Sequence, residues 1–202
     1  MSKQSKIEVN LSTEEKFKAA ARIVFTKKGY AATKTRDIAA EAGLNLALLN
    51  YYFRSKEKLF ELIMIEKVEQ LFTHIAPIIN DSTSTLNEKI DQIAINYIDM
   101  LLENPDLPLF VLSEMNRNPE RFGKIIRLDT HILNSRFIAQ LAEVKKEINP
   151  IQLFITFLGM LIFPFISKPV FQSSGTLSEA LFCKLMEERK ELTAKWMKMI
   201  LE

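Results

Sequence analysis

The sequence predicts an all-α protein with a small N-terminal helical domain followed by a larger helical body. Leu, Ile, Lys, Glu and Ala dominate the 202 residues, while Gly and Pro number only 5 and 7, a composition that favours helix. Apolar residues also recur at helical intervals between helix-capping signals, and no segment fits a strand better. Together these observations predict about nine helices around a sizeable core.

The charge distribution separates the two parts. Residues 1–60 hold 12 Lys and Arg against 6 Asp and Glu, whereas residues 61–202 hold 15 against 19. A basic first part on a mildly acidic body suits a polyanionic partner for the first part alone. A solvated, lysine-rich face would give the same composition, so this observation leaves both interpretations open.

Cysteine usage and the N-terminus indicate the compartment. The chain has one cysteine, Cys183, so an intramolecular disulfide is excluded and a reducing environment is expected. Residues 1–10 are polar and lack the apolar segment of a signal peptide. We therefore expect a cytoplasmic protein in which residues 1–10 form a disordered basic arm.

Three short helices are expected in residues 11–54. Ser12 and Glu15 form a capping box at the start of the first helix, and Gly29 stops that helix. Gly43 separates the second helix from the third, which gives this pair the dimensions of a helix-turn-helix. The second helix should cover residues 34–41 and the third residues 45–53.

Six further helices are expected in residues 55–202. Pro77 should end the first of them, and the polar segment 80–85 is the clearest loop. Pro119 and Pro150 each follow an asparagine, and proline is preferred at the first position of a helix. The expected helices cover residues 55–76, 86–103, 106–117, 119–148, 150–167 and 178–201.

A longer pattern extends through the first sixty residues. The segments Gly29–Thr33 (GYAAT), Thr35–Gly43 (TRDIAAEAG) and Asn50–Leu59 (NYYFRSKEKL) stand at fixed separations. Over residues 12–62, without a gap, the pattern resembles the N-terminal signature of the TetR family of transcriptional regulators. The resemblance implies a three-helix, helix-turn-helix DNA-binding domain and a helical effector-binding and dimerisation body. It further implies a homodimeric repressor that a small molecule releases from a near-palindromic double-stranded DNA operator.

The third expected helix has two unlike faces. One face should pack on the first helix and holds Leu49, Tyr52 and Phe53. Leu48 is expected in the core as well. The other face is unusual for a solvated helix but suits a major groove, where Asn50 can pair with adenine and apolar groups can touch thymine methyls. This helix carries no charge, unlike that of many family members, so sparse base readout is expected. The outward residues are Leu46, Ala47, Asn50, Tyr51 and Arg54.

Phosphate contacts are expected beside the same helix. Lys56 lies in the first turn of the fourth helix, where backbone amides and the helix dipole also attract an anion. A solvent-exposed lysine near Glu57 is the alternative. The resemblance assigns backbone contacts to Tyr51 and Lys56. The full expected set of DNA-binding residues is Thr33, Lys34, Thr35, Arg36, Asn45, Leu46, Ala47, Asn50, Tyr51 and Lys56.

The sequence contains no recognisable catalytic constellation. His74 and His131 each lack further ligands at metal-binding spacing, and no Gly-rich phosphate loop or activated nucleophile is present. We therefore expect no enzymatic activity, no cofactor and no metal. A helical hydrolase or hydratase is the disfavoured alternative, which salt-dependent DNA binding would exclude.

The segment Leu153–Ile166 is the most apolar run in the chain. Its 14 residues fall short of the roughly 18 of a membrane span, and it contains Pro164. We expect it to be buried between the chain's own core and a second subunit, because the resemblance places the dimer interface on the last two long helices. A monomer core and a membrane-associated adaptor are the alternatives. The expected interface residues are Phe154, Phe157, Leu158, Leu161, Leu181 and Leu185.

The body is rich in Phe and Met, which fill cores and also line adaptable apolar pockets. We favour one apolar cavity between the helices of residues 56–148, with close-packed core as the alternative. The fourth helix begins at Lys56 and continues into the body, so a ligand that tilts it would move the DNA-binding end. The expected pocket residues are Met64, Asn96, Tyr97, Met100, Phe110, Glu114, Met115, His131, Asn134 and Phe137.

Overall fold

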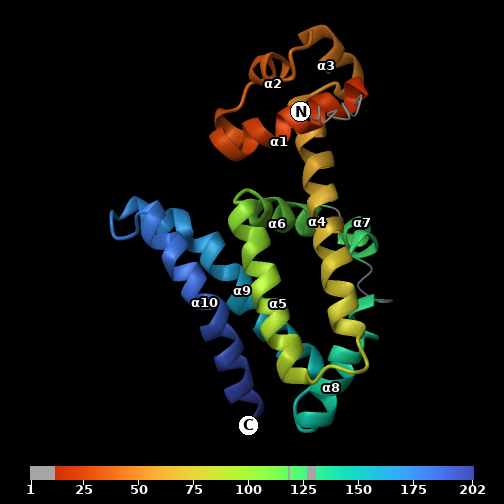
Figure 1. The fold of residues 1–202 in the computed structure, drawn as a ribbon, viewed down its shortest axis with the longest axis vertical. Helices are drawn as coiled ribbons and strands as arrows, with labels where there is room; N and C mark the ends of the chain where they lie inside the picture. The colour runs from red at the N-terminus through yellow and green to blue at the C-terminus, as the bar shows by residue number, and fades with distance from the viewer. Residues whose placement is uncertain (1–11, 118, 127–130) are drawn as a thin grey trace, which may run out of the picture. The chain divides into compact units, whose positions relative to one another are not determined.

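All regular structure in the described residues is helical. The computed structural model describes residues 12–117, 119–126 and 131–202, so the expected arm at residues 1–10 lies outside them. This part of the chain contains ten helices and no strand, which confirms the all-α prediction (Figure 1). The helices are α1 (Thr13–Ala32), α2 (Thr35–Ala42), α3 (Leu46–Phe53), α4 (Lys56–Asn80), α5 (Leu86–Glu103), α6 (Leu107–Arg117), α7 (Pro119–Ile125), α8 (Arg136–Val144), α9 (Pro150–Ser173) and α10 (Glu179–Leu201).

The chain divides into two compact units, which we call the N-terminal unit (Met1–Ile63) and the C-terminal unit (Met64–Glu202). The boundary falls inside α4 rather than at its start, where the sequence suggested it. The cause is aromatic packing between α4 and the end of α1. The ring centroid of Phe60 lies 5.0 Å from that of Phe25 and 4.5 Å from that of Tyr30.

The N-terminal unit buries one face of each of its short helices. The Ser12 hydroxyl accepts a hydrogen bond from the Glu15 N–H at 3.2 Å, which begins α1 as expected. Phe17 of α1 is fully buried and meets Phe53 of α3 edge to face, with ring centroids 6.2 Å apart. The other buried apolar residues of α1, α2 and α3 are Ala20, Ala21, Val24, Phe25, Ile38, Ala39 and Leu49.

Helix α4 continues past the proline that was expected to end it. Pro77 lacks an N–H, so it removes one helical hydrogen bond from the preceding turn, but the following residues keep theirs. The Asp81 N–H donates to the Pro77 carbonyl at 3.0 Å, and the Asn80 side chain donates to the Ala76 carbonyl at 2.9 Å. The helix therefore ends at Asn80, one turn later than the sequence suggested.

The single helix expected over residues 119–148 is instead two helices, α7 and α8. The Ser135 hydroxyl accepts from the Ile138 N–H at 3.3 Å, and Ser135 is only 2% exposed. A buried serine in that position is an N-cap, so a new helix begins there. The sequence prediction missed it because the apolar spacing continues through this segment.

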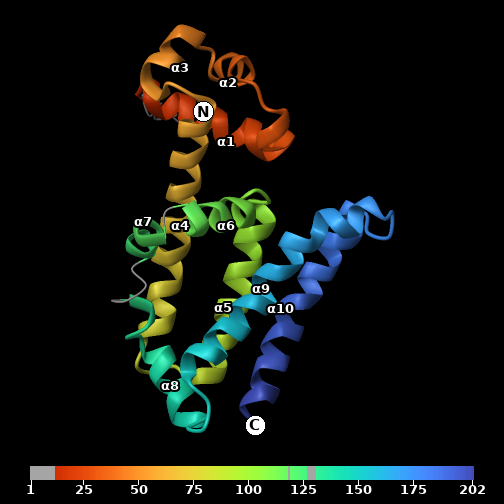
Figure 2. The same cartoon turned by 180° about the vertical axis from the view of Figure 1, so that it is seen from behind.

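Helices α5 and α10 lie side by side in the C-terminal unit, with α9 against α10 (Figures 1 and 2). Ion pairs join α5 to α10 at two points, Lys190 to Asp99 and Lys198 to Asp91, each 2.6 Å long. Between the two ion pairs the buried residues of these helices are apolar except for Thr193. They are Ile93, Ala94, Ile98, Thr193, Ala194 and Met197.

Helix α9 runs through two prolines and ends at Ser173, beyond the expected Ser167. Pro164 has no N–H to bond the carbonyl of Met160, four residues earlier. The Arg189 side chain of α10 fills that place, because its Nε donates to the Met160 carbonyl at 2.9 Å. A bond between the two helices thus replaces the one that proline removes, which explains why α9 is not broken there.

By length and composition alone, α9 could cross a membrane, and it is the one such helix in the part of the chain that the structure describes. It has 24 residues and a mean hydropathy of 1.9 over its most apolar window. The helix continues beyond the 14-residue apolar run, so the length of that run does not exclude a membrane span. One such helix is weak evidence for a membrane span, since core helices of soluble proteins also meet these criteria. Leu153, Phe157, Leu161 and Phe165 are buried within this chain.

Candidate nucleic-acid interface

Helix α3 is held by two buried side chains and exposes the rest. Leu49 is 0% and Phe53 6% exposed, and their spacing of four residues puts both on one face. Tyr51, on the opposite face, is 79% exposed. The outward placement of Leu46, Ala47, Asn50 and Tyr51 agrees with the sequence analysis. Leu48 and Tyr52, which were expected in the core, are also exposed (41% and 43%) because two anchors suffice for so short a helix.

The turn before α3 and the cap after it fix the direction of this helix. Gly43 adopts a left-handed conformation (φ 64°) and its N–H donates to the Ala40 carbonyl, so α2 ends there. The Asn45 side chain then accepts from the Ala47 N–H at 2.8 Å and starts α3. At the other end Arg54 has a positive φ of 63°, and its N–H donates to the Asn50 carbonyl at 2.9 Å.

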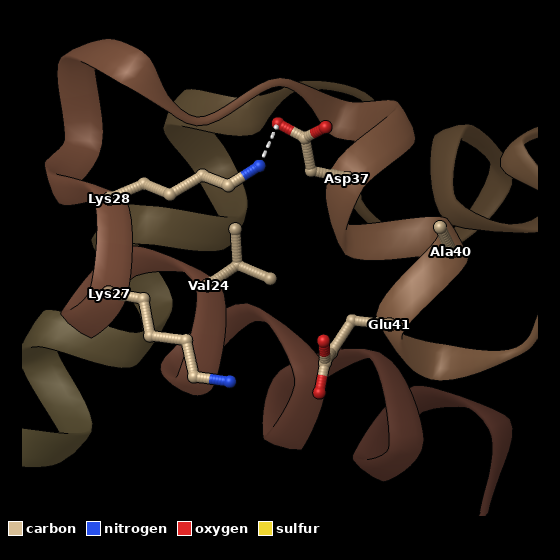
Figure 3. Close-up of a pocket in the computed structure, with 6 residues that line it drawn as sticks. All are labelled: Val24, Lys27, Lys28, Asp37, Ala40 and Glu41. Carbon is tan, nitrogen blue, oxygen red and sulfur yellow. Dashed lines mark ion pairs between the residues drawn. The ribbon is translucent and has the colours of Figure 1, made fainter.

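The start of α2 presents two basic side chains, those of Lys34 and Arg36, and both are exposed. The Asp37 carboxylate accepts from the Lys34 N–H at 3.0 Å and pairs with Lys28 at 3.3 Å (Figure 3). The hydrogen bond from Lys34, together with Lys28, holds the pKa of Asp37 below its ordinary value. Thr35 is partly exposed beside them, so the first turn of α2 keeps its expected position at the surface.

Two residues expected to contact phosphate make hydrogen bonds within the N-terminal unit. Thr33 is 1% exposed, and its hydroxyl donates to the Gly29 carbonyl at 2.7 Å. The Lys56 ammonium donates to the carbonyls of Tyr30 and Thr33 at 2.9 and 3.0 Å, and lies 4.1 Å from the centroid of the Tyr30 ring. The physical reason is Gly29, whose φ of 73° interrupts α1 and leaves carbonyls that need donors. Lys56 thus ties the start of α4 to the end of α1.

One cation next to α3 was left out of the expected DNA contacts. Arg54 was expected on the outward face, and it caps the end of α3 and is exposed. Its position directly after the aromatic end of the helix was the available signal. Lys58 is exposed too, but it pairs with Glu61 at 3.0 Å.

A surface hollow of about 360 Å³ lies between α1 and α2 (Figure 3). Lys27 and Lys28 line it from α1, and Asp37 and Glu41 line it from α2. Val24 and Ala40 complete the lining. A charged and open lining differs from the apolar cavity expected of an effector site, and no residue of the expected pocket is among these six.

The expected pocket residues of the C-terminal unit divide into buried and exposed sets. Met115 is 50% exposed and Asn134 is exposed, so these two do not line an interior, because each lies on the outer side of its segment. Burial raises the pKa of Tyr97 to about 12. Asn96, Tyr97, Met100 and His131 are partly exposed, while the buried members are Met64, Phe110, Glu114 and Phe137.

The expected interface residues divide in the same way. Phe157 and Leu161 are 1% and 0% exposed within one chain, so their side chains pack in their own core. Phe154 and Leu158 are partly exposed, and Leu181 and Leu185 are exposed. The periodicity of an all-apolar helix did not indicate which face is inward. The exposed apolar side chains of α9 and α10 are Ile151, Ile155, Phe163, Val170, Phe171, Leu181, Leu185, Leu192, Trp196, Met199 and Ile200.

Comparison with known proteins agrees with this arrangement. Residues 19–63 match the family model described as bacterial regulatory proteins, tetR family. A curated relative in Bacillus subtilis (strain 168), "Probable HTH-type transcriptional regulator YttP", is 27% identical over 134 residues, 66% of this chain and 64% of the relative. The match thus spans somewhat less than two thirds of that protein.

Solved structures share the fold over nearly the whole chain. The match to the TetR family regulator PfmR from Thermus thermophilus spans 92% of this chain and 96% of the PfmR chain, with a TM-score of 0.60 and 22% identity. The match to the regulator FadR from Bacillus subtilis, solved in complex with stearoyl-CoA, spans 89% of this chain and 97% of the FadR chain, with a TM-score of 0.57 and 17% identity. At these identities the likeness shows the fold alone. The family match confirms the resemblance inferred from the N-terminal pattern.

Proposed function

We propose that this transcriptional regulator of the TetR family is a repressor that binds a near-palindromic DNA operator as a homodimer and is released by a small molecule. The observation that carries the proposal is the exposed, uncharged face of α3 in a basic unit of the chain. Such a face is poorly suited to water but fits a major groove. Regulators of this family are normally cytoplasmic and without enzymatic activity.

Docking would place α3 in the major groove with cations on either side of it. Lys34 and Arg36 precede the helix and Arg54 follows it, and all three are exposed. Basic side chains at those positions suit phosphates, which supply most of the affinity of a protein for DNA. The Thr35 hydroxyl and the first backbone N–H groups of α2 can also donate hydrogen bonds to DNA phosphates. We retain Asn45 at the start of α3 as a contact through its side-chain N–H groups.

The homodimer is supported by the apolar stripes on the last two helices. Ile151, Ile155 and Phe163 recur at multiples of four residues along α9, with the exposed Gly159 between them. A Cβ added at Gly159 would meet nothing within 4 Å, so a partner helix has room to approach there. Contiguous exposed apolar surface marks an interaction site, and a second copy of the chain would cover it on both protomers.

The effector is proposed to bind in the interior of the C-terminal unit, around Tyr97 and the buried Glu114. The C-terminal unit also buries the apolar side chains of Met64, Phe110 and Phe137, and a few polar groups with many apolar ones are typical of small-molecule sites. Helix α4 contributes to both units, so an effector that changes its orientation would change DNA affinity. Such a coupling is worth about 1–3 kcal/mol.

Selection of bound sequences from a random DNA pool, followed by affinity measurements over a range of salt concentrations, tests the function. We expect near-palindromic sites and an affinity that falls steeply with salt, because bound phosphates release counterions. As a control, Lys195→Ala alters an exposed lysine of α10 and should leave the salt slope unchanged. Absence of salt-dependent binding to any sequence would exclude the proposed function.

A thermal-shift screen tests the effector site, and long-chain acyl-CoA thioesters belong in it because FadR was solved with stearoyl-CoA. A true effector must bind less tightly in the presence of operator, by reciprocity. Ligands that stabilise the protein but leave operator affinity unchanged contradict the release mechanism.

One observation favours a second candidate, a membrane-associated helical adaptor. It is the length and hydropathy of α9. Fractionation of the expressed chain distinguishes the two, since an adaptor of this kind would sediment with membranes and the proposed homodimer would remain in the supernatant.

A further inference from the structure

The exposed face of α3 has a narrow chemistry. No side chain between Leu46 and Phe53 is charged, and the only amide is that of Asn50. Asn45, which precedes the helix, already uses its carbonyl oxygen to accept from the Ala47 N–H at 2.8 Å. The exposed side chains are Leu46, Ala47, Leu48, Asn50, Tyr51 and Tyr52.

The four base pairs make different demands on such a face. Guanine presents two acceptors in the major groove, which Arg or Lys satisfies, and cytosine presents an amine, which Asp or Glu satisfies. Helix α3 offers none of these groups. Adenine pairs with an amide such as that of Asn50, and the methyl group of thymine needs only an apolar contact.

The cations beside α3 in the sequence lie outside the eight residues of this helix. Lys34 and Arg36 lie at the start of α2, and Arg54 is the residue after α3. Phosphates border the groove on both sides, so these side chains are placed for the backbone and leave the base edges to α3.

We propose that α3 reads a half-site core of A·T pairs. Leu46, Ala47 and Leu48 contact thymine methyl groups, and Asn50 pairs with one adenine. The inference rests on the proposed function and names the class of DNA that the same face recognises. Ordinary exposed leucines, which soluble proteins also carry, are the alternative that the experiments exclude.

Selection from a random pool with the full-length protein is the first test. We expect A·T pairs at the central positions of each half-site, and guanine or cytosine enriched at those positions overturns the inference. Selection also separates this inference from the proposed function. If only the A·T inference is wrong, a salt-dependent complex forms on sites with other base pairs. If the proposed function is wrong, no salt-dependent complex forms on any sequence.

Uracil tests the methyl contacts, because it differs from thymine only in lacking that group. Each thymine of a selected site is replaced in turn, and the dissociation constant should rise by about fourfold for each contacted methyl group. In the Leu46→Ala variant the rise should disappear at the thymine that Leu46 contacts. Ile23→Ala is the matched control, because Ile23 of α1 is 42% exposed and Leu46 is 38% exposed, but Ile23 lies outside α3. Uracil substitution without effect at every central thymine overturns the inference.

Asn50→Asp tests the adenine contact by changing one group while keeping the shape. A carboxylate only accepts hydrogen bonds, so it suits the cytosine amine and no longer donates to adenine. Repeated selection with this variant should replace adenine by cytosine at one position of each half-site and leave the thymine positions as they were. A variant that folds and binds with adenine still selected at every position removes Asn50 from the reading face.

Discussion

Helices α3 and α9 both expose apolar side chains, but they differ in length and surroundings. α3 has 8 residues, lies in a unit with an excess of basic residues and has cations before and after it. α9 has 24 residues, and beside it α10 exposes a second apolar stripe. In α3 the exposed set includes Asn50 and two tyrosines, whereas the stripe of α9 is Ile, Phe and Val.

The kind of partner that covers an exposed apolar surface can be inferred only from the side chains around that surface. Cations around a short apolar helix fit a polyanion with apolar groups in its groove. A long apolar stripe beside a second one fits another copy of the same surface, because a two-fold axis brings like surfaces together. We therefore propose DNA as the partner of α3 and a second protomer as the partner of α9, and the variants below test one proposal at a time.

The largest effect is expected from Ile155→Glu combined with Phe163→Glu. Both side chains are exposed in one chain (57% and 65%), so the protomer should fold, but carboxylates without partners should prevent the two copies from meeting. Light scattering should show a monomer, and operator affinity should fall by about a hundredfold or more because one head contacts only half a site. Lys146→Glu, exposed before α9, is the control. A double variant that remains dimeric would place the interface elsewhere.

The next largest effect separates the two faces of α3. Leu49→Ala removes a fully buried side chain and should destabilise the N-terminal unit by about 2–5 kcal/mol. Leu48→Ala removes the same atoms from an exposed position and should change stability by less than about 0.5 kcal/mol. Urea unfolding measures both. Equal losses for the two variants would mean that α3 is packed on both sides and has no free face.

Lys56→Ala should cost about 1–3 kcal/mol in the stability of the N-terminal unit, because two carbonyls at the end of α1 lose a charged donor. Hydrogen exchange at the end of α1 should increase, while the salt slope of DNA binding should not change. Lys34→Ala is the contrasting variant, since a lost phosphate contact lowers the slope by about one unit. A reduced slope for Lys56→Ala would return Lys56 to the phosphate contacts.

The smallest effect concerns Tyr97 in the C-terminal unit. Burial raises its pKa to about 12 from the ordinary value of 10.0, so in the folded protein the hydroxyl stays protonated where the unfolded chain has lost its proton. The unfolded state then binds fewer protons, and stability should fall as the pH rises from about 10 to 12, by about 2 kcal/mol. Tyr97→Phe should reduce this alkaline loss. An unchanged pH profile in that variant would mean that the hydroxyl is hydrated.

Local signals predicted most of the N-terminal unit from the sequence alone. Ser12, Gly43 and Asn45 each act on neighbouring backbone groups, so their effects do not depend on distant residues. The outward position of Asn50 and Tyr51 followed from helix geometry in the same way.

The errors arose where a distant residue decides the outcome. Lys56 was assigned from its place in its own helix, but its ammonium also donates to carbonyls 26 and 23 residues earlier. The length of α9 depends on Arg189, which is 29 residues from the carbonyl that Pro164 leaves free. The buried face of an all-apolar helix is likewise set by what packs against it, so Phe157 and Leu161 were assigned to the wrong side.

The most direct test of the two assignments is side-chain labelling in solution, read by mass spectrometry, on the free protein and on its complex with a selected operator. Tyr51 is 79% and Phe163 65% exposed in a single chain. We expect Tyr51 to be labelled in the free protein and protected by the operator, and Phe163 to be protected in both because the second protomer covers it. Equal labelling of Tyr51 with and without operator would exclude α3 as the DNA-binding helix.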